Sequence, residues 1–186
     1  MIKPKNFEKK GRKAQGSRAA LSKIKSSIAD LRSGDGIVRQ TARETLTLIG
    51  RQAVGHLIPL LKDPEDDVRW EAAKALTDIV DVRAASELVA TLEDSNFGVR
   101  WLAAEGLIAI GREVLPPLME ALTKHSDSAW LREGAHHVLH DLPKRDPEVK
   151  DFVAPVITAL EGSEPEIGVM ELAHTALDKL EGQGRA

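Results

Sequence analysis

The chain has 186 residues, of which 42% are hydrophobic and 3% aromatic, and a formal net charge of −3 at pH 7. It contains no Cys, which excludes disulfides, thiolate zinc sites and Cys nucleophiles. It has no apolar run of the roughly 18 residues that a membrane span needs, and no signal-type segment at its start. We therefore expect a cytoplasmic protein without membrane contact, sized for one domain or a short repeat array.

Charge is distributed unevenly along the chain. Residues 1–25 hold nine of the 26 Lys and Arg residues and one of the 29 Asp and Glu residues, so a basic segment precedes an acidic remainder. Residues 1–16 carry few large apolar groups and cannot bury enough surface to offset the entropy of ordering. They are predicted to form a basic, flexible N-terminal tail.

The tail could bind a polyanion, because clustered cations attract RNA, the ribosome or an acidic protein surface through salt-sensitive contacts. The candidate polyanion-binding residues are Lys3, Lys5, Lys9, Lys10, Arg12 and Lys13. The alternative is a solubilising tail, or one that folds back onto the acidic remainder of its own chain.

The ordered part is predicted to run from residue 17 to 181 as helices, because apolar residues recur there at spacings of three and four. The first helix starts at Ser17 and stops in the turn at 33–36. The following helices are predicted at 37–49, 52–62, 66–80, 84–93, 98–110, 113–124, 129–142, 150–160 and 166–180. Gly50 and Gly111 each follow a helix end, where a residue without Cβ can cap it. Residues 182–186 form a short C-terminal tail.

One stretch recurs five times along the chain. The copies are VRQTARETL at 38–46, VRWEAAKAL at 68–76, VRWLAAEGL at 99–107, LREGAHHVL at 131–139 and VMELAHTAL at 169–177. Their leading residues are 30, 31, 32 and 38 apart, which is the length of two helices and two turns. A single hairpin has too narrow an apolar stripe to be stable alone, so the hairpins must stack into an array.

This pattern, Leu-x-x-Leu, a short turn, Asp, then Val-Arg-x-x-Ala-x-x-x-Leu, resembles the HEAT repeat in its short phycobilisome-lyase-like (PBS lyase HEAT-like) variety. The resemblance covers about residues 17–181. It implies an all-α fold, an armadillo-like α-solenoid (α-α superhelix) of about five hairpins, whose second helices line a concave surface.

The resemblance also implies a ladder of hydrogen bonds between an Asp and an Arg six residues later. Two units have both residues: Asp63 with Arg69, and Asp94 with Arg100. The replacements in the other units are Ser33 and Ser126 for the Asp and Met170 for the Arg. The end units are therefore worn, as terminal caps of repeat arrays usually are.

Helical phase predicts which side chains face solvent on the second helices. At 100° per residue the core side of the second unit takes Val68, Ala72, Ala75, Leu76 and Ile79. The opposite phase gives an inner face that includes Gln40 and Glu44 at one end and Glu171 and Thr175 at the other. The candidate partner-binding residues between them are Trp70, Lys74, Trp101, Glu105, Glu133, His137 and His140.

Trp70 and Trp101 occupy the same position in adjacent units, and an indole on a predicted solvent face needs an explanation. Either both are hot-spot anchors for a bound partner, or each lies over its neighbour and closes the surface structurally. The sequence leaves both interpretations open. Trp130 stands at a helix entrance, directly before a core Leu, and is predicted to be a packing staple.

His136, His137, His140 and His174 form the only group of His residues close together in the predicted array. His136 and His140 are four apart on one helix, a spacing that a metal site can use. Without Cys or a His-Glu pair in an equivalent unit, packing or pH-responsive contacts are favoured, and we expect no metal and no cofactor. His136 and His174 are expected to face each other's helices.

Enzymes with similar repeats test the enzymatic interpretation. In deoxyhypusine hydroxylase the iron ligands are His-Glu pairs directly after Val-Arg, and no unit of this chain has such a pair. Bilin lyases share the repeat variety, and Trp70, Trp101, His137 and His140 could hold a tetrapyrrole, so chromophore handling stays an alternative. The sequence favours a non-enzymatic scaffold or adaptor whose concave face binds a protein segment. Ribosome or nucleic-acid association through the basic arm is the further alternative.

Overall fold

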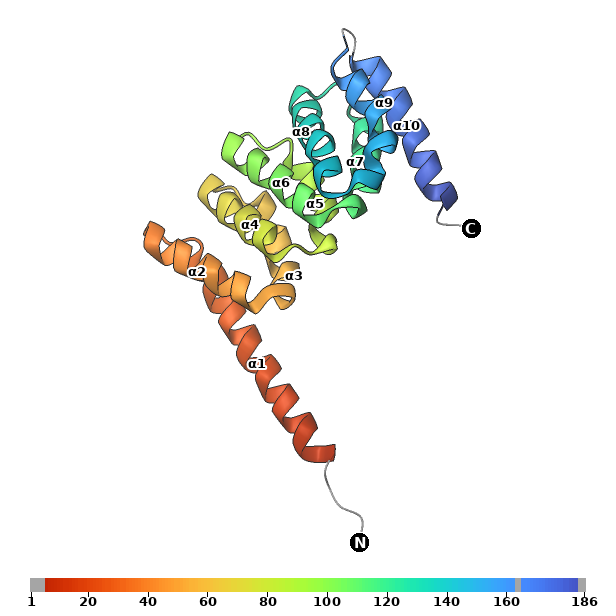
Figure 1. Cartoon of the computed structure of the whole chain (residues 1–186). Helices are drawn as coiled ribbons and strands as arrows, with labels where there is room; N and C mark the ends of the chain where they lie inside the picture. Colours follow the sequence, from red (N-terminus) through yellow and green to blue (C-terminus); the bar gives the residue numbers. More distant parts are fainter. Residues whose placement is uncertain (1–5, 163–164, 184–186) are drawn as a thin grey trace.

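The computed structural model describes residues 6–162 and 165–183, with side chains described for 17–162 and 165–180. Within these residues all regular structure is helical, and the helices stack side by side along one direction (Figure 1). The predicted all-α solenoid is confirmed. No helix in the described part is both long enough and apolar enough to cross a membrane.

The helices form two layers joined by short turns. The first layer holds α1 (Asn6–Asp30), α3 (Val54–Leu57) with η2 (Ile58–Lys62), α5 (Ala85–Thr91) and α7 (Leu115–Lys124). The second layer holds α2 (Gly36–Ile49), α4 (Asp66–Ile79), α6 (Phe97–Ile110) and α8 (Ala129–Arg145). Single 3-10 turns lie between the layers at η1 (Gly50–Gln52), η3 (Val82–Ala84), η4 (Arg112–Val114) and η5 (Pro147–Val149). The last hairpin is α9 (Lys150–Leu160) and α10 (Pro165–Gln183).

Two helices near the start of the array differ from the sequence prediction. α1 begins at Asn6 rather than Ser17, so its backbone is helical through part of the predicted tail, 1–16, of which residues 1–5 lie outside the described residues. The helix predicted at 52–62 is instead α3 followed by η2. Pro59 lies at this junction and lacks the N–H that an α-helical bond to Gly55 would require.

The core lies between the two layers and consists of small and branched apolar side chains. On α4, Val68 and Ala72 are fully buried and Leu76 is 1% exposed, as the helical phase predicts. Leu88 on α5 and Leu118 on α7 are their buried counterparts in the first layer. Burying such a side chain contributes about 1.5–3 kcal/mol, so the stacked stripes supply the main driving force for folding.

α2, α4 and α6 end in the same way. The residue after each helix has a positive φ, 69° for Gly50, 53° for Val80 and 99° for Gly111. Its N–H donates to the carbonyl oxygen of the Leu four residues earlier. This positive-φ cap ends the helix and returns the chain to the first layer.

Pro143 stands at the corresponding position of α8, four residues beyond Leu139. Its ring holds φ near −65° and its nitrogen has no hydrogen, so it cannot form the positive-φ cap. α8 therefore continues to Arg145, past its predicted end at 142. Each added residue rotates the chain by about 100°, so the chain leaves α8 in a different direction from the earlier units.

The last hairpin packs the other way round. In the preceding units first-layer helices pack on first-layer helices and second-layer helices on second-layer helices, but α9 lies against α8 and α10 lies against α7 (Figure 1). The prediction that Glu171 and Thr175 continue the inner face beside α8 is therefore wrong. His174 does not face His136 but pairs through Nδ1 with Oδ2 of Asp178 on its own helix, at 3.3 Å.

Candidate binding site

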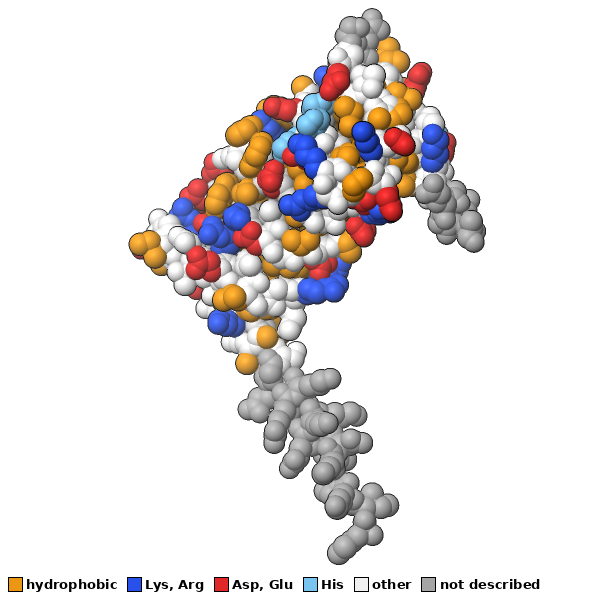
Figure 2. Space-filling view, in the orientation of Figure 1, with side chains coloured by type: hydrophobic (Ala, Val, Ile, Leu, Met, Phe, Trp, Pro, Cys, Tyr) orange, Lys and Arg blue, Asp and Glu red, His pale blue; other side chains and the backbone are white. Residues whose placement is uncertain are grey.

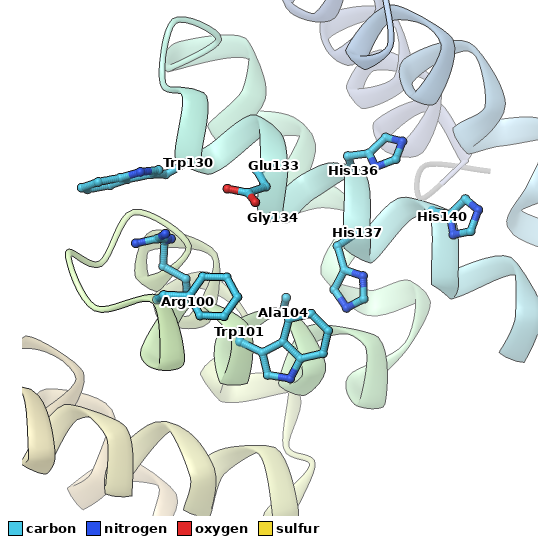
Figure 3. A pocket seen from close by; sticks show the side chains of 10 residues that line it. Arg100, Trp101, Ala104, Trp130, Glu133, Gly134, His136, His137 and His140 are labelled. Atoms are coloured by element: carbon cyan, nitrogen blue, oxygen red, sulfur yellow. The ribbon is translucent and has the colours of Figure 1, made fainter.

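A cavity of about 380 Å³ opens between α6 and α8 on the solvent side of the second layer. We call it the α6–α8 pocket. Its lining residues are Phe97, Arg100, Trp101 and Ala104 from α6, and Trp130, Glu133, Gly134, His136, His137 and His140 from α8 (Figure 3). In the space-filling view, hydrophobic side chains and the pale-blue His side chains gather over these two helices (Figure 2).

Three aromatic side chains stand exposed at this pocket. Phe97 is 62% exposed, Trp101 49% and Trp130 45%. The whole sequence has three Phe, three Trp and no Tyr, so half of its aromatic residues line one cavity. Exposed aromatic surface is costly in water, so this cluster makes the α6–α8 pocket the candidate binding site.

Arg100 lies between two of these rings. Its Cζ is 4.6 Å from the ring centroid of Trp130 and 5.6 Å from that of Phe97. Its Nη1 donates to the backbone oxygen of Asp94 at 2.8 Å and more weakly to that of Ser95 at 3.4 Å. The loop thus holds one corner of the guanidinium while the aromatic rings cover its faces.

The equivalent arginines of the other units each reach a carboxylate. Arg69 holds Asp94 with two bonds, Nε to Oδ2 at 2.6 Å and Nη2 to Oδ1 at 3.0 Å, and the hydrogen bond to Asp94 raises the pKa of Arg69 above its usual value. Nη2 of Arg39 lies 2.9 Å from Asp67, and Nη1 of Arg132 lies 3.8 Å from Glu166. Among the residues whose side chains are described, no carboxylate pairs with Arg100.

The cause lies in the next turn of the array. Asp94 precedes α6 by the same interval at which Ser126 precedes α8, so Ser126 stands where a carboxylate would meet Arg100. The ladder also differs in detail from the predicted one. Arg69 and Arg100 donate to the backbone oxygens of Asp63 and Asp94 within their units, while each Asp carboxylate accepts from an arginine of the preceding unit, Arg32 or Arg69.

His137 forms one side wall of the pocket. Its ring stacks on Trp101, with centroids 4.8 Å apart and planes 23° apart, and its Nε2 lies 3.0 Å from Oε1 of Glu105 (Figure 3). Three of the predicted partner-binding residues therefore meet across the α6–α8 seam. Glu105 does not line the pocket itself, but it fixes the orientation of the imidazole.

Trp70 and Lys74 lie away from the pocket. A Cβ built on Gly98 would lie 3.2 Å from Cδ1 of Trp70, so the indole rests against the start of α6. Cζ of Arg43 lies 5.5 Å from the ring centroid of the same indole. Lys74 pairs with Asp78 on its own helix at 2.6 Å. Trp70 therefore fits the structural interpretation, because it packs across the α4–α6 seam. Trp101 lines the pocket and fits the interpretation as a binding anchor.

Two known families of helical repeats match parts of this chain. The pattern of HEAT repeats matches residues 24–108, and that of the PBS lyase HEAT-like repeat matches residues 99–124. The chain is a HEAT-repeat protein of the PBS-lyase-like type. The solved structures include a similar engineered protein, with 20% sequence identity and a TM-score of 0.40 over 86% of this chain and 81% of that one. Comparison with curated proteins found no match.

Among the residues of this HEAT-repeat site that sequence reasoning missed are the three around the Arg100 guanidinium. Phe97 and Arg100 were not expected in it, and Trp130 was predicted to be a packing staple, whereas it is 45% exposed and covers the Arg100 guanidinium. The available signal was Ser126, which replaces the ladder Asp in the unit that follows Arg100 and leaves Arg100 to face the pocket.

The remaining His residues of the pocket contact carboxylates at its rim. Nε2 of His136 lies 3.0 Å from Oε1 of Glu161, and Nδ1 of His140 lies 2.9 Å from Oδ1 of Asp141. Hydrogen bonds from Lys144 and His140 lower the pKa of Asp141 to about 2. In the described part of the chain no group of three His, Cys, Asp or Glu side chains could hold a metal ion.

The predicted polyanion-binding residues of the N-terminal arm, Lys3, Lys5, Lys9, Lys10, Arg12 and Lys13, lie outside the residues whose side chains are described. Binding of RNA or of an acidic partner by this arm of the HEAT-repeat protein therefore stays a prediction from the sequence.

Proposed function

We propose that this HEAT-repeat protein is a non-enzymatic scaffold that binds a segment of a partner protein in the α6–α8 pocket. HEAT repeats are generally protein-interaction scaffolds. The observation that carries the proposal is the gathering of Phe97, Trp101 and Trp130, each 45–62% exposed, around a single cavity. Trp and Arg are the residue types most enriched among those that dominate binding energy at protein interfaces.

The shape and size of the pocket suit one or two side chains of a partner segment. Its volume of about 380 Å³ is near the lower end of the range for ligand sites, about 300–1,000 Å³. The helices that carry its walls, α6 and α8, pack on a buried core, with Ala103 fully buried and Leu131 1% exposed. A preformed aromatic wall loses little conformational entropy on binding, which favours affinity.

A binding role fits the pocket better than catalysis. No Ser, Thr, Cys or Lys lines the cavity, so it offers no hydroxyl, thiol or amine nucleophile. The chromophore-handling alternative would use a ring nitrogen of His137 or His140 to hold a pyrrole. Nε2 of His137 is held by Glu105 and Nδ1 of His140 by Asp141, and Trp70, which that alternative also counts on, lies outside the cavity.

The proposal can be tested with a random peptide library displayed on phage and selected on the full chain. Selected peptides are synthesised with a fluorophore, and their affinities are measured by fluorescence anisotropy. The Trp101→Ala/Trp130→Ala double variant should bind at least about 30-fold more weakly, since an interface anchor contributes about 2 kcal/mol or more.

The matched control is Leu48→Ala, which removes an 87% exposed apolar side chain from α2, away from the pocket. It should leave the affinities unchanged. Circular dichroism of each variant checks that the helices are intact. Selected peptides that bind the folded double variant as tightly as the wild type would refute the proposal.

A further inference from the structure

We infer that the α6–α8 pocket recognises a carboxylate next to an apolar or aromatic group, as an acidic peptide segment presents it, and that this carboxylate binds Arg100. The inference rests on the proposed function and specifies the chemistry of the partner. The ligand would provide the carboxylate that this chain lacks at position 126, where Ser replaces the Asp of the ladder.

The Arg100 side chain is held by its loop in the same way as that of Arg69, but without a carboxylate partner among the described residues. In Arg69, Nη1 donates to the loop carbonyl of Asp63 while the Nε and Nη2 edge holds both oxygens of Asp94. In Arg100, Nη1 donates to the loop carbonyl of Asp94 in the same way, at 2.8 Å. Its Nε and Nη2 have no acceptor among the described residues. These two nitrogens form the edge that matches a carboxylate with two parallel hydrogen bonds.

That edge of Arg100 is accessible. The buried side-chain nitrogen and oxygen atoms without a partner in the described residues are Nε of Arg39 and Oγ1 of Thr47, so neither open nitrogen of Arg100 is sealed from solvent. Trp130 and Phe97 cover the faces of the guanidinium and reduce its contact with water. A carboxylate bound there would meet a charge that is preorganised and partly desolvated.

The surrounding charges limit the kind of anion. Glu133 lines the same pocket and is not paired with any cation in the described part, so it repels a ligand with high negative charge. A polyphosphate or nucleic acid backbone would also face the acidic remainder of the chain. A single carboxylate beside an apolar side chain meets Arg100 and the rings of Trp101 and Trp130 with the least repulsion. An Asp or Glu adjacent to an apolar residue of a partner segment has this composition.

The first test uses three small probes with the same ring: 3-phenylpropanoate, 3-phenylpropanamide and 2-phenylethylamine. Affinities for the full chain are measured from chemical-shift changes of the indole N–H signals of Trp101 and Trp130. We expect the carboxylate to bind about tenfold more tightly than the amide, since a charge-assisted bidentate pair is stronger than a neutral hydrogen bond. The amine should bind more weakly than the carboxylate.

The decisive variant is Ser126→Asp, which places a carboxylate where Asp94 stands in the preceding unit. It should occupy Arg100, raise the thermal unfolding midpoint and remove the preference for the phenylpropanoate, so that loss of binding cannot be blamed on unfolding. Arg100→Gln should also remove the preference. Arg69→Gln, at the equivalent arginine with its own Asp94, should retain it even though the chain is less stable.

The outcomes separate this inference from the proposed function. If the carboxylate has no advantage over the amide, or if it keeps its advantage in Ser126→Asp, the inference is wrong. If the Trp101→Ala/Trp130→Ala variant still loses the selected peptides in that case, the proposed function stands without it. If those peptides bind the double variant normally, both fail.

Discussion

The α4–α6 seam and the α6–α8 seam are built from the same repeat, yet one is closed and the other holds a pocket. At the closed seam Arg69 binds the Asp94 carboxylate, and the indole of Trp70 lies against the start of α6. At the open seam the corresponding Arg100 has no carboxylate partner among the described residues, and Trp101 is 49% exposed. The difference shows how a repeat array can acquire a site without changing its fold.

Two substitutions in the later unit account for the opening. Trp70 can lie on α6 because Gly98 has no side chain, and the corresponding residue of α8 is Trp130. An indole at that position occupies the start of α8, and Trp101 stacks instead on His137, seven residues further along the same helix. Ser126 removes the carboxylate of the ladder at the same seam. Size at one position and charge at another thus convert packing residues into pocket walls.

The largest contrast is expected for the two ladder positions. Asp94→Ala removes a carboxylate whose side chain is 7% exposed and leaves Arg69, 12% exposed, without its partner. Breaking such a pair costs about 3 kcal/mol of the free energy of unfolding, because a charge stays partly buried without compensation. Ser126→Ala, the equivalent change at the open seam, should cost less than about 0.5 kcal/mol, as surface substitutions usually do.

Urea unfolding followed by circular dichroism at 222 nm measures both changes. A loss for Ser126→Ala as large as that for Asp94→Ala would mean that the α6–α8 seam is closed by a contact equivalent to the ladder, and the contrast between the seams would disappear.

Replacing Trp70 should mainly reduce stability, whereas replacing Trp101 should mainly reduce peptide affinity. Trp70→Ala removes a half-buried indole that packs on the α6 backbone and should lower the free energy of unfolding by about 2 kcal/mol, below the 3–5 kcal/mol of a fully buried Trp. Trp101→Ala should cost less than about 1 kcal/mol. Peptide affinity should show the reverse order, with a loss for Trp101→Ala only.

Thermal unfolding and anisotropy on the same preparations provide both measurements. Equal losses of affinity for the two variants, with both still folded, would restore the interpretation of Trp70 and Trp101 as a pair of anchors.

The regular part of the fold was predictable because its signals are local. The apolar stripe gave the core, and Val68, Ala72 and Leu76 are buried as predicted. The helix ends at Gly50 and Gly111 followed from the need for positive φ. The reversal of the last hairpin was not foreseen, although Pro143 stands where those caps would be. Its effect depends on the direction in which the chain leaves α8, which helical periodicity does not describe.

The site was predictable only in part, because helical phase gives the direction of a side chain but not its neighbour. Trp101, Glu133, His137 and His140 face the pocket as the phase predicts. Trp70 has the same phase as Trp101 but meets Gly98 on the next helix. Arg100 was assigned to the ladder, and its release depends on Ser126 in the following unit. The final positions of Trp70 and Arg100 therefore depend on pairs of residues from different repeats, which the pattern within one repeat does not reveal.

The smallest effect concerns the opposite edge of the array, where ion pairs follow the helix ends at the α2–α4 seam and at the α6–α8 seam. Hydrogen bonds from Arg83 hold the pKa of Asp81 well below its usual range, with Arg51 also 2.9 Å away, and the Asp81 side chain is 1% exposed. Hydrogen bonds from Arg112 also lower the pKa of Asp146, but that side chain is 20% exposed. Solvent should therefore weaken the second contact more than the first.

A carboxyl group with a lowered pKa in the folded state stabilises the fold above its unfolded pKa of about 3.9, and this contribution is lost as the pH falls through the folded pKa. Asp81→Asn should therefore lower the free energy of unfolding by about 1.5 kcal/mol at pH 7, the lower end for hydrogen bonds to charged groups. The difference from wild type should shrink as the pH falls from about 5 toward 2, measured by urea titrations at each pH. Asp146→Asn should show a smaller loss with the same direction of pH dependence. A loss for Asp81→Asn that stays constant down to pH 2 would mean that shape rather than charge holds this edge, because a protonated Asp and an Asn differ little in size.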